Sequence, residues 1–137
     1  MIQKHRYKVD KLIRDKIPEI LRKDNVVVSV RRMKKAEYIN RLKDKLLEET
    51  KETLKTNTQN DLKEELADVL EVIHALIDAH GLSYQEIENI RFEKKDKKGG
   101  FEKRIYNAYV EMNRDNKAID YYKSRSDDYP DISDEFF

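Results

Sequence analysis

Two segments with helical periodicity, joined by a short polar link, limit most strongly how this chain can fold. The first runs from residue 34 to about residue 55, and its apolar side chains recur every three or four positions (Tyr38, Ile39, Leu42, Leu46). The second continues this spacing in a longer series (Leu62, Leu66, Val69, Leu70, Ile73, Leu76, Ile77). Because the link 56–60 is polar and short, we expect the two helices to pack as antiparallel neighbours.

Shorter helices are predicted on either side of this hairpin. Pro18 suits the first position of a helix, which predicts a helix over about 18–24. Ser83 and Glu86 have the spacing of a capping box, which predicts a helix that begins at about residue 84 and runs to about 97.

The sequence predicts a fold that is mainly all-α. Its three glycines and two prolines supply too few turns for an all-β fold but enough for a bundle of a few long helices. The β-branched run at 26–31 predicts one short β element, and a short helix or strand is expected near 101–113. A single strand cannot satisfy its own backbone groups. We therefore expect the fold to be completed by oligomerisation, as a homo-oligomer that is a dimer or a tetramer.

Residues 1–113 are expected to form this helical domain, and residues 114–137 an acidic, aromatic C-terminal tail. The 29 basic and 28 acidic side chains nearly cancel, so the charge does not favour binding to a nucleic-acid polymer. No apolar run is long enough to span a membrane, and the N-terminus has no apolar stretch typical of a signal peptide. We expect a cytoplasmic protein. The chain has no cysteine, which excludes disulfides and thiolate metal ligands.

Two short acidic segments, EETKE at 48–52 and EELAD at 64–68, lie in the two long helices. At about 100° per residue, Glu49 falls near the middle of the first apolar stripe and Glu52 at its edge. Glu65 and Asp68 fall on the apolar side of the second helix, whereas Glu64 points toward the polar side. A carboxylate on an apolar face is unfavourable unless it is paired or bound to a metal.

The four acids on the apolar faces (Glu49, Glu52, Glu65, Asp68) therefore predict a metal site. Carboxylate ligands without cysteine, and without a histidine at ligand spacing, suit Mg²⁺, with Mn²⁺ as a substitute. Structural salt bridges are the alternative interpretation, and Lys45 lies near enough to the first stripe to neutralise one acid. It cannot neutralise all four.

The pattern Glu-x-x-Glu followed by Glu-x-x-Asp on consecutive helices resembles the MazG-like and phosphoribosyl-ATP pyrophosphohydrolase-like branch of the all-α nucleoside triphosphate pyrophosphatases. Two further segments resemble that branch: KLIRDKIPE at 11–19 and KGGFEKRI at 98–105. The resemblance covers about residues 9–106. It implies a nucleoside triphosphate or a related nucleotide as the substrate, and cleavage between the α and β phosphates to give a nucleoside monophosphate and pyrophosphate.

The resemblance also implies roles for individual residues. The four acids would bind the Mg²⁺ that holds the triphosphate, and Glu49 or Glu52 would be the general base; their spacing does not choose between these two. Candidates for binding the phosphates are basic residues in the opening segment and around the glycine pair (Arg14, Lys16, Lys94, Lys98, Arg104). Removal of unwanted nucleotides is the expected function. Hydrolysis of phosphoribosyl-ATP and a non-catalytic helical interaction module are the alternatives.

Overall fold

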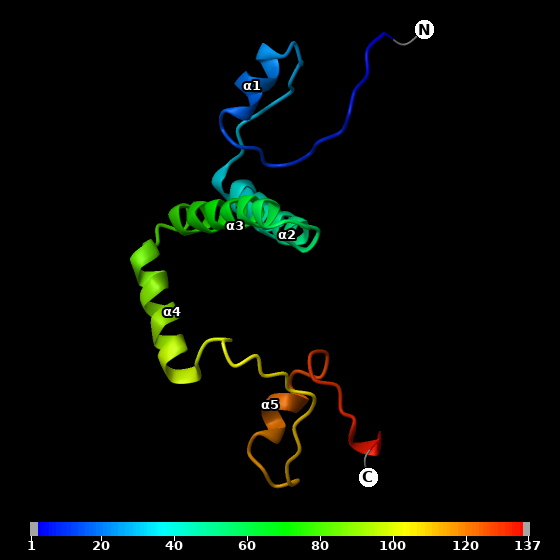
Figure 1. Ribbon diagram of the computed structural model, residues 1–137, viewed down its shortest axis with the longest axis vertical. Coiled ribbons are helices and arrows are strands. Elements are labelled where there is room, and N and C mark those ends of the chain that lie inside the picture. Colours follow the sequence, from blue (N-terminus) through cyan, green and yellow to red (C-terminus); the bar gives the residue numbers. More distant parts are fainter. Residues whose placement is uncertain (1–2, 136–137) are drawn as a thin grey trace. The chain divides into compact units, whose positions relative to one another are not determined.

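The computed structural model describes residues 3–135, and the chain is mainly helical (Figure 1). Its elements in chain order are α1 (Ile17–Lys23), α2 (Lys35–Leu54), α3 (Gln59–Ala79), α4 (Tyr84–Lys98), α5 (Ile119–Lys123) and the 3₁₀-helix η1 (Ser133–Glu135). The all-α prediction is confirmed. The chain divides into two compact units between Lys97 and Lys98. The proposed family-like domain over 1–113 stays a prediction.

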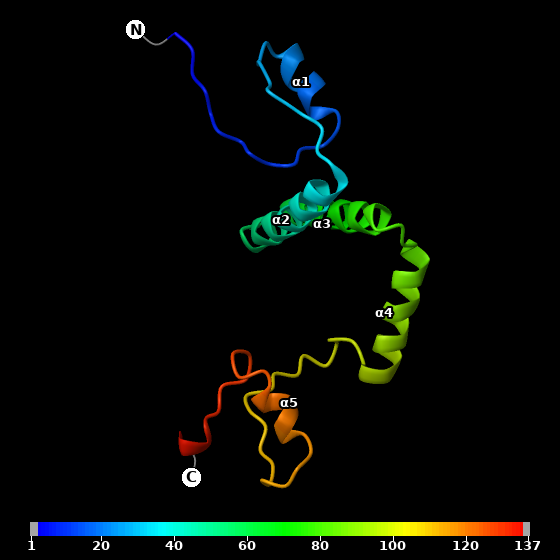
Figure 2. The same ribbon diagram turned by 180° about the vertical axis from the view of Figure 1, so that it is seen from behind.

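Helices α2 and α3 pack against each other as the predicted hairpin (Figures 1 and 2). The link 55–58 turns the chain, and Thr58 Oγ1 accepts a hydrogen bond from the Asp61 backbone N–H at 3.1 Å, which caps the start of α3. The buried side chains of the described residues are Leu42 on α2 and Val72 and Ile77 on α3. The predicted apolar series includes the buried Leu42 and Ile77, but it did not include Val72, and its members Leu62, Leu66 and Leu70 are exposed.

Helix α3 ends at a left-handed glycine, as its position in the sequence predicts. Gly81 has φ +66°, and its N–H donates to the Asp78 carbonyl at 3.0 Å. The Leu82 N–H donates to the Ile77 carbonyl at 3.0 Å. These two bonds form a Schellman motif and satisfy carbonyls that the helix end would leave free. The predicted cap of α4 is also present, since the Glu86 N–H donates to Ser83 Oγ at 3.0 Å.

The predicted β element near 26–31 is wrong, because the described residues contain no strand and 26–31 has no regular secondary structure. The end of α1 supplies the reason. Asn25 has φ +63° and its N–H donates to the Arg22 carbonyl, while the Val26 N–H donates to the Leu21 carbonyl at 3.0 Å. The first valine of the run is thus held in the cap of α1 and cannot enter a ladder.

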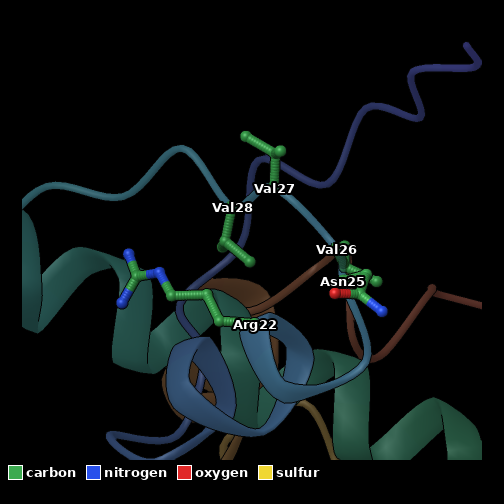
Figure 3. Close-up of a pocket in the computed structure, with 5 residues that line it drawn as sticks. All are labelled: Arg22, Asn25, Val26, Val27 and Val28. Atoms are coloured by element: carbon green, nitrogen blue, oxygen red, sulfur yellow. The ribbon is translucent and has the colours of Figure 1, made fainter.

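The valines after this cap lie beside an open hollow at the end of α1. Figure 3 shows Val28 directed toward the aliphatic stem of Arg22, whereas Val27 points away from the helix. The Val27 side chain is 97% exposed. Without a neighbouring strand, β-branched residues gain little from an extended conformation, so propensity alone did not produce a strand here.

The expected short helix or strand near 101–113 is also wrong. Residues 101–103 form a turn, and no regular element follows up to residue 113. Arg104, with φ +55°, lies just after the turn. In the unit from residue 98 onward, the two tyrosines of α5, Tyr121 and Tyr122, pack edge-to-face with ring centroids 5.2 Å apart. Tyr122 also packs edge-to-face on Tyr129, which follows α5, with centroids 5.1 Å apart.

Leu42 should contribute more to stability than any exposed leucine of the same helix. Its side chain is only 3% exposed, so Leu42→Ala should lower the free energy of unfolding by about 2–5 kcal/mol through lost burial and a residual cavity. Leu54→Ala is the matched control, because Leu54 is 82% exposed and should change stability by less than about 0.5 kcal/mol. Urea unfolding followed by circular dichroism measures both variants, and equal losses would contradict the assigned core.

Candidate metal site

Three of the four predicted acids meet across the seam of the hairpin. Glu49 on α2 and Glu65 and Asp68 on α3 each offer a carboxylate oxygen, and these three oxygens lie within 4.8 Å of one another. All three residues are half-buried. Glu65 and Asp68 are three positions apart and so share one face of α3. The helical phase of the sequence therefore placed these acids correctly on the facing sides of the two helices.

Glu65 is the least compensated member of the cluster. Its Oε2 atom is buried and has no hydrogen-bond partner among the described residues. Burial raises the pKa of the Glu65 carboxyl, and the facing carboxyl of Glu49 raises it further, followed by the charges of Asp68 and Glu52. A buried carboxylate oxygen without a donor, next to other carboxylates, is the environment that a cation would stabilise.

Lys45 provides part of the compensation from within α2. Its Nζ lies 3.7 Å from Glu49 Oε1 and 3.3 Å from Glu48 Oε2, and its side chain is mostly buried. Lys11 approaches Glu48 from the opening segment, with Nζ 3.0 Å from Oε1. Burial opposes ionisation of Glu48, but the hydrogen bonds from Lys11 and Lys45 outweigh it and lower the pKa of that carboxyl. Glu48 is therefore paired, unlike Glu65.

Asp68 is paired with a residue far away in the sequence. Arg14 Nη2 donates to Asp68 Oδ1 at 2.7 Å, a short charge-assisted hydrogen bond. The side chains of Arg14 and Asp68 are 57% and 38% exposed, so water also reaches this pair. The predicted phosphate-binding residue Arg14 thus lies at the acid cluster and contacts one of its members.

The fourth predicted acid, Glu52, stands apart from the three clustered carboxylates. Its side chain is 45% exposed, and its Oε1 lies 3.6 Å from Lys55 Nζ. Glu52 is one turn beyond Glu49 on α2, and its charge contributes to the raised pKa of Glu65. The structure therefore brings together Glu49, Glu65 and Asp68 and leaves Glu52 at the edge.

The remaining predicted phosphate-binding residues belong to other segments of the chain. Lys16 is exposed immediately before α1, and Lys94 is exposed on α4. Lys98 and Arg104 belong to the unit that begins at residue 98. Their roles stay predictions.

Sequence reasoning did not single out Glu48 and Lys11. Glu48 lies three residues after Lys45 and four before Glu52, and this i, i+3 spacing was an available signal for its pairing with Lys45. The contact with Lys11 spans 37 positions, and no local pattern indicates it.

The residues present fit a hard divalent cation. Three oxygen donors converge from two helices, and one of these carboxylates has an oxygen with no hydrogen-bond donor. Oxygen-only ligands suit Mg²⁺ or Mn²⁺ and do not suit the softer metals that prefer sulfur. Chemically, such a cluster can hold a cation that in turn binds phosphate oxygens.

No protein-family model matches the chain, and comparison with curated proteins and with solved structures finds no match either. The resemblance to the all-α nucleoside triphosphate pyrophosphatases therefore stays a prediction from the sequence motifs. None of the helices described in residues 3–135 has both the length and the apolar character needed to cross a bilayer.

The raised pKa of Glu65 predicts how Glu65→Gln should change stability with pH. Above this pKa, charged Glu65 repels Glu49 and Asp68 in the folded protein and lowers the free energy of unfolding. As the pH falls through the raised pKa of Glu65 toward the ordinary glutamate value of 4.5, Glu65 takes up a proton in the folded protein before it does so in the unfolded chain. Protonation removes the repulsion, and with it the loss of stability. In the absence of metal, Glu65→Gln should therefore be more stable than wild type at neutral pH, and this difference should shrink as the pH is lowered.

Glu64→Gln on the same helix is the control, because Glu64 is exposed. Thermal unfolding of the three proteins between pH 7 and pH 4 in a chelating buffer makes the comparison. Equal effects of the two glutamine variants at every pH would contradict the clustered arrangement.

Proposed function

We propose that the protein is a cytoplasmic, magnesium-dependent nucleoside triphosphate pyrophosphohydrolase that removes unwanted nucleotides. The convergence of Glu49, Glu65 and Asp68 carries the proposal, because a cation would relieve the repulsion among three carboxylates whose oxygens lie within 4.8 Å of one another. The order and spacing of the acidic segments, and their resemblance to the all-α pyrophosphatases, supply the substrate class and the bond that is cleaved.

In this proposal Glu49, Glu65 and Asp68 hold Mg²⁺. When bound, the ion neutralises charge on the phosphate oxygens of the substrate. The chain itself orients the triphosphate through basic side chains, of which Arg14 is the nearest to the acids. Water attacks the α-phosphorus and gives a proton to the general base, the bond between the α-phosphorus and the α–β bridging oxygen breaks, and pyrophosphate leaves the nucleoside monophosphate.

Glu52 is the better candidate for the general base. Glu52 lies outside the group of three and its partial exposure admits water, although its Oε1 also lies 3.6 Å from Lys55 Nζ. Glu49, by contrast, faces Glu65 and is half-buried next to Lys45. Removal of a general base typically lowers the rate by about 10²–10⁴-fold.

Pyrophosphate release from a panel of nucleoside triphosphates, measured with and without Mg²⁺, tests the proposal. Wild type should release pyrophosphate only with Mg²⁺. Asp68→Ala should weaken metal binding and lower the rate, whereas Glu52→Ala should lower kcat about 10²–10⁴-fold with a smaller effect on metal affinity. Glu64→Ala, which removes an exposed carboxylate from the same helix as Asp68, should leave the rate unchanged.

Two results would reject the proposal: release of orthophosphate in place of pyrophosphate, or activity that neither Glu52→Ala nor Asp68→Ala changes. Including phosphoribosyl-ATP in the panel distinguishes the related hydrolase. No turnover of any nucleotide, combined with retention of the fold, would favour the non-catalytic interaction module.

We also propose that the protein assembles as a homo-oligomer, with a second copy covering α3. Leu62, Leu66 and Leu70 recur every four residues on one face of this helix, and all three are partly exposed. Only three residues in the described part of the chain are buried, a small core for its length. Packing two hairpins face to face into a four-helix arrangement would cover this leucine stripe.

Leu66→Glu should convert the assembly to monomers, because a partner helix would have to bury a charge at the centre of the stripe. Light scattering at several protein concentrations measures the mass, and circular dichroism shows whether the helices persist. Asn60→Glu is the control, since it adds the same charge to α3 away from the leucines. A wild-type protein that is monomeric at every concentration would contradict the proposed assembly.

A further inference from the structure

The opening segment contacts both helices that carry the acidic cluster. Lys11 Nζ lies 3.0 Å from Glu48 on α2, and Arg14 Nη2 lies 2.7 Å from Asp68 on α3. The contacts span 37 and 54 positions of sequence. Residues 3–14, at the blue end of the chain in Figure 1, form neither helix nor strand.

The two cations nearest the three clustered carboxylates differ in how firmly they are held. Lys45 is mostly buried and contacts both Glu48 and Glu49 on its own helix. Arg14 is 57% exposed and makes one contact with Asp68 through a segment without regular structure. Water competes for an exposed pair of this kind, so its net stabilisation is small. Of the two cations, Arg14 can therefore leave the cluster with the smaller loss of stabilising free energy.

We infer that Arg14 is a displaceable counterion of the acid cluster, which contacts Asp68 in the free protein and transfers to a phosphate group of the substrate when the divalent cation binds. The inference rests on the proposed function and assigns Arg14 a positioning role in it. The Arg14 guanidinium and a divalent cation compete for the same Asp68 carboxylate. Once released, the planar guanidinium is able to bind two phosphate oxygens at once, and it is already located beside the cation site.

This exchange makes a prediction that a purely structural salt bridge does not. Without nucleotide, removal of Arg14 should strengthen metal binding, because the competitor for Asp68 is gone. With nucleotide, the same change should weaken substrate binding, because a phosphate ligand is gone. If the salt bridge only supported the fold, its removal would weaken both metal binding and substrate binding.

Titration with Mn²⁺, with free Mn²⁺ measured by electron paramagnetic resonance in the absence of nucleotide, tests the first half. Arg14→Gln should bind Mn²⁺ about two- to fivefold more tightly than wild type, the range expected for loss of a weak competing ion pair. Arg14→Lys keeps the charge and should bind Mn²⁺ nearly as wild type does. Arg31→Gln is the matched control: Arg31 forms a bidentate pair with Glu37 at 2.6 and 2.8 Å, outside the acid cluster, and its loss should leave Mn²⁺ affinity unchanged.

Steady-state pyrophosphate release tests the second half. Arg14→Gln should raise KM for the nucleotide about tenfold, while Arg31→Gln leaves it unchanged. Circular dichroism and unfolding curves show that each variant remains folded. Equal or weaker Mn²⁺ binding by folded Arg14→Gln would overturn the inference and leave the proposed function intact. Absence of Mn²⁺ binding by wild type would overturn both.

Discussion

The approach of Glu49 and Glu65 across the seam of α2 and α3 is the interaction on which the rest of the site depends. The packing of Leu42 and Val72 fixes the rotation of each helix, and this rotation turns both glutamates toward the same space. Burial and mutual repulsion then raise the pKa of Glu65. The hydrophobic seam thus maintains an arrangement of like charges that isolated helices would avoid.

The basic side chains around this seam show how far the protein itself can compensate those charges. Lys45 contacts Glu49, and Arg14 contacts Asp68, but Glu65 Oε2 has no donor among the described residues. A network that served only to stabilise the fold would be expected to supply a donor to each buried oxygen. This incomplete compensation favours the metal site over the interpretation as structural salt bridges.

Local patterns predicted the hairpin and its glycine stop, because both depend on helical spacing within about one turn. They also predicted four converging carboxylates, of which the structure brings together three and leaves Glu52 at the edge. The same reasoning failed at Val26, whose β propensity is overridden by the helix cap that Asn25 completes. It also gave no indication that Arg14 pairs with Asp68. That pairing depends on how a segment without periodicity returns to the hairpin, and 54 positions separate the partners. Contacts of this kind depend on tertiary structure, and no local pattern in the sequence indicates them.

Asp68 and the exposed pair Leu66 and Leu70 lie on different faces of α3. At 100° per residue, Leu66 and Leu70 each lie about 160° from Asp68 around the helix axis. A second copy packed on Leu66 and Leu70 would therefore cover the side of α3 opposite Asp68, whereas Glu65 lies about 100° from Leu66 and about 140° from Leu70. Such packing would also restrict movement of α3, and cation ligands need to be held within a fraction of an ångström to bind well. The hairpin has a small core, so contacts on the apolar side of α3 would stabilise it. The same contacts would hold the carboxylates of α3 in place.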